Sequence, residues 1–397
     1  MPSHGALADI RVLDVTQVMA GPYCAMLLCD MGADVIKVEP PAGDSSRRMA
    51  GASGADSPSF NAVNRGKRGV VIDLKSAEGR GVLERLATSA DVFVENFRPG
   101  VMAKLGLGYP RLAHLNPRLV YASISGYGQT GPKASRGGFD LVAQGVSGII
   151  SVTGELGRAP VKAGVPITDL GAALFAVSGI LAALHYRDAR TGRGQHIDTS
   201  LVEAGVALSV WEATEYFSDG GVPGPLGSAH RMSAPYQAIR CADGHITLGG
   251  ANDRIFRRVC DLLGHASWAD DPDYADDTAR VRNRAVLARQ IEAITETQSC
   301  RHWLDLFDAH DIPCGPINDY AAVVRDPQIQ AREMVVETEH PTLGTIKTLG
   351  SPIKLSETPV TPARPAPLLG QHTDAVLREA GYDDAEIARL RDAKVVK

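Results

Sequence analysis

Short apolar runs, each of a strand's length, recur through the first third of the chain and are separated by segments of helical length. The runs occupy residues 10–15, 35–39, 69–74, 91–95 and 119–124. Between them, one helix is expected from Gly21–Pro22 to about Met31, and another through Leu83 to Leu86. Because strands that alternate with helices pair in parallel, this order predicts an α/β protein with a doubly wound parallel sheet.

Polar and aromatic residues follow these runs, where each strand is expected to end. They include Gln17, Lys75, the segment Asn96–Phe97–Arg98, and Gly126–Tyr127. A parallel sheet binds its ligands at the carboxyl ends of its strands, so these side chains predict a site for a nucleotide-like ligand. The dinucleotide signature G-x-G-x-x-G does not follow the first run, which makes an NAD-binding protein the weaker alternative.

Asp169 stands at the start of an apolar helix that is expected to run to about Leu184. The free N–H groups and the positive dipole end of a helix stabilise a carboxylate, so Asp169 is expected to stay ionised and could act as a nucleophile. From this segment alone, an N-cap is the simpler interpretation, because Asp is a favoured capping residue. The apolar run from Gly171 to Leu184 is too short to span a bilayer and indicates a buried helix, so no membrane partner is expected.

Composition disfavours several classes of protein. The 397 residues carry a net charge of −5 without a dense block of Lys and Arg, so a nucleic-acid partner is not expected. Six cysteines without a C-x-x-C pair indicate reduced thiols in a cytoplasmic protein, and the first residues do not have the pattern of a secretory signal. The G-x-S-x-G, H-E-x-x-H and P-loop motifs are missing, and neither their chemistries nor a metal site is expected.

The alternation of strands and helices ends after residue 200. A loop is expected at 219–227 from its Gly and Pro content, and a strand pair from Arg240 to Gly250 with its turn at 242–244. Residues 253–310 are expected to be helical, and 368–397 to return to helix. The stretch 341–367, rich in Pro and Thr, is expected to be an extended crossing segment.

A series of short segments is shared, in order, with one known family. They are LDVTQ (13–17), AGP (20–22), GADVIKVE (32–39), NRGKR (64–68), VENFRPG (94–100), SGYG (125–128), TGRGQ (191–195), IPCGP (312–316) and PLLGQHT (367–373). With these segments the chain resembles the class III CoA-transferases, the family that includes formyl-CoA transferase and carnitine CoA-transferase. The resemblance extends from residue 13 to residue 373, which is nearly the whole chain.

The resemblance implies that Asp169 is the catalytic aspartate. In the family this residue attacks the acyl-CoA thioester, and catalysis proceeds through an aspartyl mixed anhydride and an aspartyl-CoA thioester. Gln17 is implied to offer its amide to developing oxyanions. Gly249 and Gly250 match the place of a mobile glycine loop that covers the active site, although the next residues depart from the family pattern and an ordinary turn remains the alternative.

For coenzyme A, the resemblance points to residues at the expected strand ends and just beyond them. They are Ile72, Asp73, Leu74, Lys75, Asn96, Phe97, Arg98 and Lys104. Arg136 is expected to replace a basic residue whose position varies in the family before Asp140. Asp140 is expected either to orient groups beside Asp169 or to make a structural hydrogen bond. Arg47 and Arg48 are added as phosphate contacts on charge alone, and the implied chemistry requires neither ATP nor a metal.

The resemblance also implies an architecture: a Rossmann-like large domain, a smaller α+β domain, and an interlocked homodimer. The expected boundaries are 1–200 for the first part of the large, CoA-binding domain and 201–335 for the small domain with its linker. Residues 336–397 are expected to form the crossing segment and the return to the large domain. Succinyl-CoA is the expected donor, and a small dicarboxylate or related acid the expected acceptor.

Two alternatives remain open. A 2-methylacyl-CoA racemase would share the fold, but such racemases use a His–Asp pair, and Phe139 stands where that His would be. A phenyl ring carries no exchangeable proton, so two-base chemistry at the α-carbon lacks a partner. The alternative of another class is a non-catalytic nucleotide-binding protein, and the presence of both Asp169 and Gln17 argues against it.

Overall fold

The computed structural model describes residues 5–49, 56–250, 252–360 and 364–397. The chain forms two compact units. The first contains Met1–Ile149, Ala163–Thr214 and Pro327–Lys397, and the second contains Ile150–Lys162 and Glu215–Asp326. These limits differ from the predicted boundaries at 200 and 335, because the first unit continues to Thr214 and resumes at Pro327, and residues 150–162 belong to the second unit.

The first unit is built on a six-stranded sheet in the order β3-β2-β1-β4-β5-β6, and every neighbouring pair is parallel. The strands are β1 (Arg11–Asp14), β2 (Asp34–Glu39), β3 (Arg68–Val71), β4 (Val92–Glu95), β5 (Val120–Ser125) and β6 (His196–Ser200). This order confirms the predicted parallel sheet. The sequence did not predict β6, because this edge strand is largely exposed and Ile197 is its only aliphatic residue.

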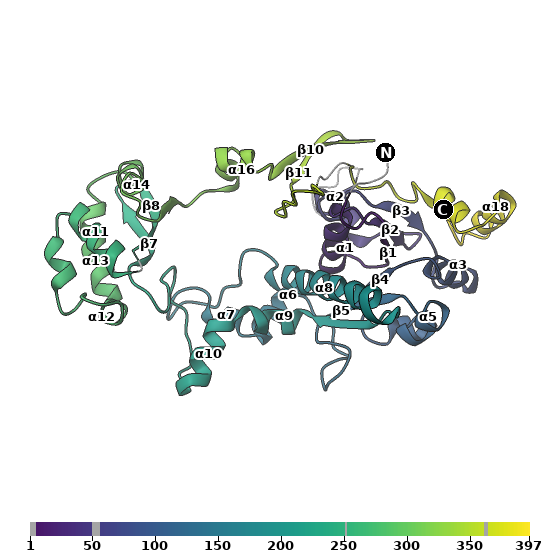
Figure 1. Ribbon diagram of the computed structural model, residues 1–397, viewed down its shortest axis with the longest axis horizontal. Coiled ribbons are helices and arrows are strands. Elements are labelled where there is room, and N and C mark those ends of the chain that lie inside the picture. Colours follow the sequence, from purple (N-terminus) through teal and green to yellow (C-terminus); the bar gives the residue numbers. More distant parts are fainter. Residues whose placement is uncertain (1–4, 50–55, 251, 361–363) are drawn as a thin grey trace. The chain divides into compact units, whose positions relative to one another are not determined.

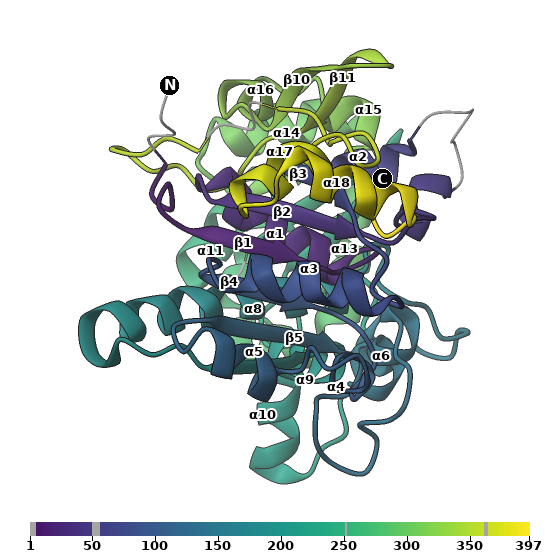
Figure 2. The ribbon, with the colours of Figure 1, turned by 90° about the vertical axis from the view of Figure 1, so that its right-hand side faces the viewer.

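Helices cover both faces of this sheet, and residues next to each other on a strand point to opposite faces. Val12 of β1 packs with α1 (Ala20–Asp30), α8 (Ile167–Tyr186) and α9 (Leu201–Leu208). Its neighbour Leu13 packs on the other face, where Met102 of the short helix α4 (Val101–Lys104) contributes and four longer helices cover most of the sheet. They are α3 (Ala77–Ala87), α5 (Tyr109–Leu115), α17 (Thr373–Glu379) and α18 (Asp384–Asp392), which lie in front of the sheet in Figure 2. The sheet is therefore doubly wound, as predicted.

The C-terminal segment returns to the sheet beside β3. The His372 N–H donates to the carbonyl of Gly69, and the Val71 N–H donates to the Thr373 hydroxyl at 3.2 Å. Ile72 and Val396 form an antiparallel bridge. Both ends of the chain thus contribute to the first unit (Figure 1).

Helix α8 has 20 residues and is followed by a π-helical turn, η2 (Arg187–Thr191). It is the one helix among the described residues that is long and apolar enough to cross a membrane by length and composition. The prediction that this segment is too short for a span is therefore wrong, because the helical segment extends beyond the apolar run 171–184 at both ends. Half of its most apolar window is buried, and the helix packs against α1, α9, β5 and β6.

The first unit also contains shorter elements. They are η1 (Ser45–Arg48), α2 (Pro58–Asn64), α4 (Val101–Lys104), α6 (Asp140–Val146), α16 (Pro327–Ala331), β10 (Val335–His340) and β11 (Gly344–Leu349). Strands β10 and β11 form an antiparallel hairpin, so the stretch 341–367 is not wholly the extended segment that its Pro and Thr content predicted. Arg65 fixes this hairpin by donating to the carbonyl of Leu349 at 2.6 Å.

The second unit has a three-stranded antiparallel sheet with helices packed against it. Its strands are β7 (Tyr236–Cys241), β8 (Gly244–Gly249) and β9 (Cys314–Pro316). Its helices are α11 (Asp253–Leu262), η3 (Ala266–Asp270), α12 (Asp277–Arg282), α13 (Arg284–Thr295), α14 (Cys300–Asp308) and α15 (Tyr320–Val323). Two short helices, α7 (Ile149–Val152) and α10 (Val210–Asp219), lie where the chain passes between units. The predicted strand pair, its turn and the helical region after it are confirmed.

Candidate active site

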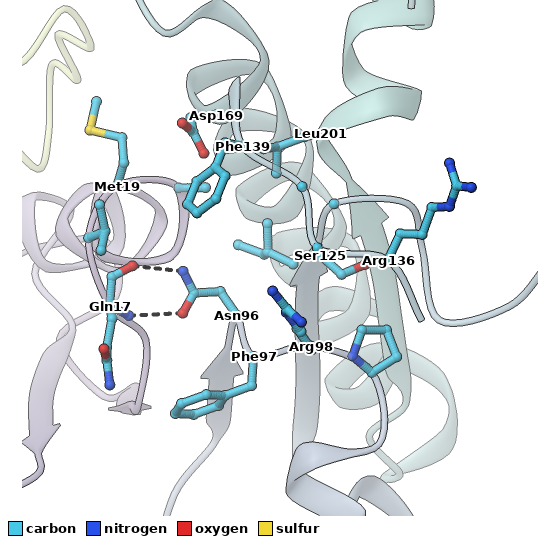
Figure 3. A pocket seen from close by; sticks show the side chains of 17 residues that line it. Gln17, Met19, Asn96, Phe97, Arg98, Ser125, Arg136, Phe139, Asp169 and Leu201 are labelled. Carbon is cyan, nitrogen blue, oxygen red and sulfur yellow. Dashed lines mark hydrogen bonds between the residues drawn. The ribbon is translucent and has the colours of Figure 1, made fainter. Parts of the chain in front are cut away.

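The chain leaves the neighbouring strands β1 and β4 at the point where the strand order of the sheet reverses. In open α/β sheets, ligands bind in the crevice at this point. Gln17 follows β1, Asn96 follows β4, and the Asn96 side chain spans the crevice. It accepts from the Gln17 N–H at 2.8 Å and donates to the Gln17 carbonyl at 2.8 Å (Figure 3). The two loops are thereby joined where a ligand is expected.

A cavity of about 310 Å³ opens beside these loops. Its wall consists of segments 17–20, 96–99, 124–126 and 136–139, together with Asp169 and Leu201 (Figure 3). These segments follow β1, β4 and β5, while Asp169 belongs to the first turn of α8. Five predicted site residues, Gln17, Asn96, Phe97, Arg98 and Arg136, therefore share one cavity with Asp169.

Glycines allow the chain to pass closely through this wall. A Cβ atom on Gly126 would lie 2.7 Å from the backbone N and Cα of Gly138. A Cβ atom on Gly137 would lie 2.7 Å from a guanidinium nitrogen of Arg98. Real Cβ atoms do not approach backbone atoms this closely, so Gly126 and Gly138 must lack side chains for the cavity to keep its shape, whereas a side chain at Gly137 would only require the flexible end of Arg98 to move.

Asp169 does not cap its helix. The N-cap position of α8 is Pro166, and Asp169 is the third helical residue. Burial, followed by the negative charge of Asp140, raises the pKa of Asp169 from 3.8 to about 6. The helix end therefore does not hold the pKa of Asp169 low, since desolvation and a neighbouring carboxylate oppose the helix dipole. Asp169 still carries its charge at pH 7, but it is a more basic carboxylate than expected.

Asp140 takes the hydrogen bonds at the start of α8. Its carboxylate accepts from the Thr168 N–H at 3.1 Å and from the Thr168 hydroxyl at 2.8 Å. It also accepts from the Gln144 amide at 2.7 Å. Of the two roles left open by the sequence, these contacts fit a structural one, because Asp140 binds the residue before Asp169 rather than the cavity itself.

A second, more apolar cavity of about 130 Å³ lies on the other side of Gln17. It is lined by the predicted CoA-binding residues Ile72, Asp73, Leu74, Lys75 and Phe97, together with Val15, Gln17, Val38, Glu39, Pro40 and Leu105. Gln17 and Phe97 line both cavities. The Gln17 side chain points away from Asp169 (Figure 3), so its amide is not directed at the aspartate in this structure.

Other predicted residues lie elsewhere. Arg47 is buried, and its guanidinium is paired with Glu39 at 2.6 Å and Asp56 at 2.5 Å. The proposal that Arg47 contacts phosphate is therefore wrong, because internal carboxylates already use its donors. Arg48 is exposed and donates to the carbonyl of Ala42. Lys104, at the end of α4, is exposed and lines neither of the two cavities.

Gly249 and Gly250 lie at the end of β8 in the second unit, and their role stays a prediction. The Gly249 N–H donates to Pro313, and the Gly250 N–H donates to Pro235. Among the residues that the structure describes, no group of three or more His, Cys, Asp or Glu side chains is arranged to hold a metal ion.

Sequence reasoning did not single out Glu95, the last residue of β4. Its buried carboxylate accepts from the Phe97 N–H at 2.9 Å and so fixes the loop that carries three predicted CoA contacts. Burial raises the pKa of Glu95 to about 7. In the sequence, the feature that could have drawn attention to Glu95 is its position at the end of a predicted strand, directly before that loop.

The fold and the crevice define an α/β enzyme of the kind that the shared sequence segments indicated, and comparison with known proteins specifies the family. The family described as "CoA-transferase family III" matches residues 7–373. The chain belongs to this family.

Relatives with named activities are similar along nearly their whole length. The chain is 41% identical over 381 residues to a succinate–glutarate CoA-transferase from Agrobacterium fabrum, covering 94% of this chain and 95% of the relative. It is 41% identical over 387 residues to a succinyl-CoA:mesaconate CoA-transferase from Haloarcula hispanica, covering 95% and 97%. A crystal structure of a CaiB/BaiF family protein from Brucella suis is 38% identical, with a TM-score of 0.84, over 95% of this chain and 99% of that one.

Proposed function

We propose that this protein transfers CoA from succinyl-CoA to a small dicarboxylic acid, with glutarate as the first candidate acceptor and mesaconate as the second. Two relatives that each share 41% of their residues with this chain are named for these acids. The observation that carries the proposal is the position of Asp169 in a cavity that shares Gln17 and Phe97 with a second, apolar cavity. A long thioester could then place its nucleotide end near Ile72–Lys75 and its carbonyl near Asp169.

The proposed chemistry conserves the thioester bond energy. The Asp169 carboxylate attacks the succinyl carbonyl, the C–S bond breaks, and CoA leaves as a thiolate. The thiolate then attacks the aspartyl carbonyl of the mixed anhydride, which releases succinate and leaves CoA joined to Asp169. The acceptor carboxylate attacks this thioester and displaces the thiolate again. Finally the thiolate attacks the acyl carbonyl of the new anhydride, which forms the product acyl-CoA and regenerates the aspartate.

The residues around the cavity support these steps in different ways. Asp169 must be ionised to attack, and at pH 7 a pKa of about 6 leaves it mainly as the carboxylate. Arg98 and Arg136 bring positive charge to the cavity wall, which suits both an anionic thioester and a dicarboxylate. Backbone N–H groups of the cavity wall are the candidate donors for the oxyanions that form at each addition step, and the Gln17 amide joins them only after its side chain turns toward Asp169.

The proposal includes an interlocked homodimer. It is supported by exposed apolar side chains on α6, α8 and α9, three helices that pack against one another. They are Leu141, Val142, Val146, Leu174, Phe175, Val206 and Leu208, all at least 42% exposed. A layer of this kind on a soluble protein is typical of a surface that another chain covers.

The test is to incubate the protein with succinyl-CoA and a panel of mono- and dicarboxylic acids and to identify the CoA esters by mass spectrometry. Glutaryl-CoA or mesaconyl-CoA and free succinate are expected in equal amounts. Hydroxylamine added during turnover should convert Asp169 to a hydroxamate, and the isosteric Asp169→Asn variant should show neither reaction. Failure of the unmodified protein to form any new CoA ester would contradict the proposal, as would full activity in Asp169→Asn.

A further inference from the structure

Val18 forms part of the wall of the Asp169 cavity and has an unusual backbone conformation. Its φ angle is +69°, in the left-handed region. A β-branched residue is disfavoured there by a factor on the order of ten in equilibrium relative to ordinary conformations. The turn Gln17–Val18–Met19 therefore keeps its shape only if neighbouring groups hold it.

Two sets of contacts hold this turn. On one side, the Asn96 side chain binds both the N–H and the carbonyl of Gln17. On the other side, the Val18 N–H donates to the Asp44 carboxylate at 3.3 and 3.4 Å, and the Lys37 ammonium donates to the Thr16 carbonyl at 2.5 Å. Each residue from Thr16 to Val18 is thus fixed by a side chain from another element.

Lys37 and Asp44 form a fully buried ion pair. The Lys37 nitrogen lies 2.9 Å from an Asp44 oxygen, and both side chains are 0% exposed. Burial opposes the charge on Lys37, but Asp14, Asp44 and Glu39 together raise its pKa. Burial likewise opposes the charge on Asp44, yet Lys37 and Ser46 lower its pKa. Buried ion pairs add little net stability compared with apolar residues, so stability alone does not account for one at this place.

We infer that Lys37 and Asp44 are positioning residues for CoA transfer, which hold Val18 in its left-handed conformation and thereby place Gln17 and Met19 in the wall beside Asp169. Gln17 borders two cavities, and neither Lys37 nor Asp44 is among the residues that line them. They act through the backbone of residues 16–18, while Asn96 holds the same turn from the ligand side. The inference rests on the proposed function only for its activity readout.

A double-mutant cycle with Asp44→Asn and Val18→Gly tests this role. Glycine adopts positive φ without strain, so the turn depends less on Asp44 once Val18 is replaced. In the parent chain, Asp44→Asn should lower kcat for CoA transfer by about tenfold, in line with the conformational preference of a β-branched residue. In the Val18→Gly background, the same substitution should lower kcat by less than about threefold relative to Val18→Gly alone.

The matched control is Asp30→Asn in the same unit. Asp30 and Arg65 form another buried ion pair at 2.6 Å, with both side chains 4% exposed, and the other hydrogen bonds of Arg65 run to Thr348 and Leu349 of β11. This variant should lose thermal stability while its kcat stays within about twofold of the parent. If Asp44→Asn alone leaves an uncompensated buried lysine and does not fold, the pair Lys37→Met/Asp44→Asn, which removes both charges, replaces it in the cycle.

The outcomes separate the possibilities. Equal losses of kcat with and without Val18→Gly, or an equal loss in Asp30→Asn, would mean that the buried pair acts only through general stability and would overturn the inference. If the unmodified protein transfers no CoA, the proposed function has failed. The cycle is then measured on the CoA dissociation constant, because Gln17 borders both cavities, and equal losses in both backgrounds would again refute the role.

Discussion

Replacing Asp169 by asparagine should stabilise the folded protein at neutral pH while it abolishes CoA transfer. The structure raises the pKa of Asp169 from 3.8 to about 6, first through burial and then through the charge of Asp140. The folded state therefore disfavours the ionised aspartate relative to the unfolded chain. Asparagine has nearly the same shape but carries no charge, so the variant escapes this penalty. Such a conflict between stability and activity is typical of catalytic residues.

The size and the pH range of the effect follow from the same two values. The interval from 3.8 to about 6 corresponds to roughly 3 kcal/mol, at about 1.4 kcal/mol per pKa unit. Solvent at the partly exposed carboxylate reduces this to about 1–2 kcal/mol. A group with a raised folded pKa contributes stability that is present below the unfolded pKa and lost as the pH rises through the folded pKa. The advantage of Asp169→Asn should thus be absent below about pH 4, grow up to about pH 6, and then stay constant.

Urea unfolding of the parent and of Asp169→Asn at several values between pH 4 and pH 8 measures this advantage directly. Glu357→Gln, which removes the carboxylate of an exposed residue, is the control and should change stability by less than about 0.5 kcal/mol throughout. In the parent, kcat/KM should rise with pH up to about 6, as Asp169 ionises. An asparagine variant that is no more stable than the parent at pH 8 would refute the reasoning, as would an advantage of equal size at pH 4.

Three further predictions concern the cavity, the assembly and the reaction. Gly126→Ala should destabilise the protein by about 1–3 kcal/mol and sharply reduce transfer, because its Cβ would lie 2.7 Å from Gly138. The control is Gly81→Ala, whose added Cβ has no atom within 4 Å and which should change neither the melting temperature nor the transfer rate. Light scattering should find a dimer that persists on dilution, since interlocked chains separate only by unfolding, and a folded monomer would contradict the proposed topology. Mass spectrometry in D₂O should find no protein-dependent deuterium at the α-carbon of 2-methylacyl-CoA, because Phe139 cannot carry a proton; rapid exchange without an acceptor acid would favour the racemase alternative.

Buried parallel strands were predictable because their apolar runs are nearly continuous, as for β2 and β5, which are buried along almost their whole length. Strands at an exposed edge carry a weaker pattern. His196–Ser200 is mostly polar, and the hairpin of Val335–His340 and Gly344–Leu349 exposes alternate residues next to Pro341. In both cases pairing with a neighbour, which the sequence does not record, decides the conformation.

The site was predictable where function follows from the end of a strand. Gln17, Lys75 and Asn96 were placed at a cavity because the carboxyl ends of parallel strands meet at one edge of the sheet, and the family resemblance added Ile72, Asp73 and Leu74, which line the second cavity. The role of Arg47 was not predictable, because its charge alone cannot show that Glu39 and Asp56 already surround its guanidinium. Position along a strand is encoded locally, whereas the partner of a charged side chain is decided by the tertiary fold.

The pKa of Asp169 depends in part on Asp140, which lies 28 positions before Thr168 in the sequence. Asp140 accepts from the Thr168 N–H and hydroxyl, so a donor at the start of α8 that could have stabilised Asp169 serves another carboxylate instead. A carboxylate with fewer donors and a nearby negative charge is more basic, and nucleophilicity rises with basicity. For the proposed mechanism, a fully capped Asp169 would be permanently ionised but a weaker nucleophile toward a thioester. In the proposed mechanism, Asp140 would therefore make Asp169 a better nucleophile, because Asp140 accepts the Thr168 hydrogen bonds that could otherwise stabilise the Asp169 carboxylate. Local helix-capping rules do not predict this contact, because Asp140 lies far from α8 in the sequence.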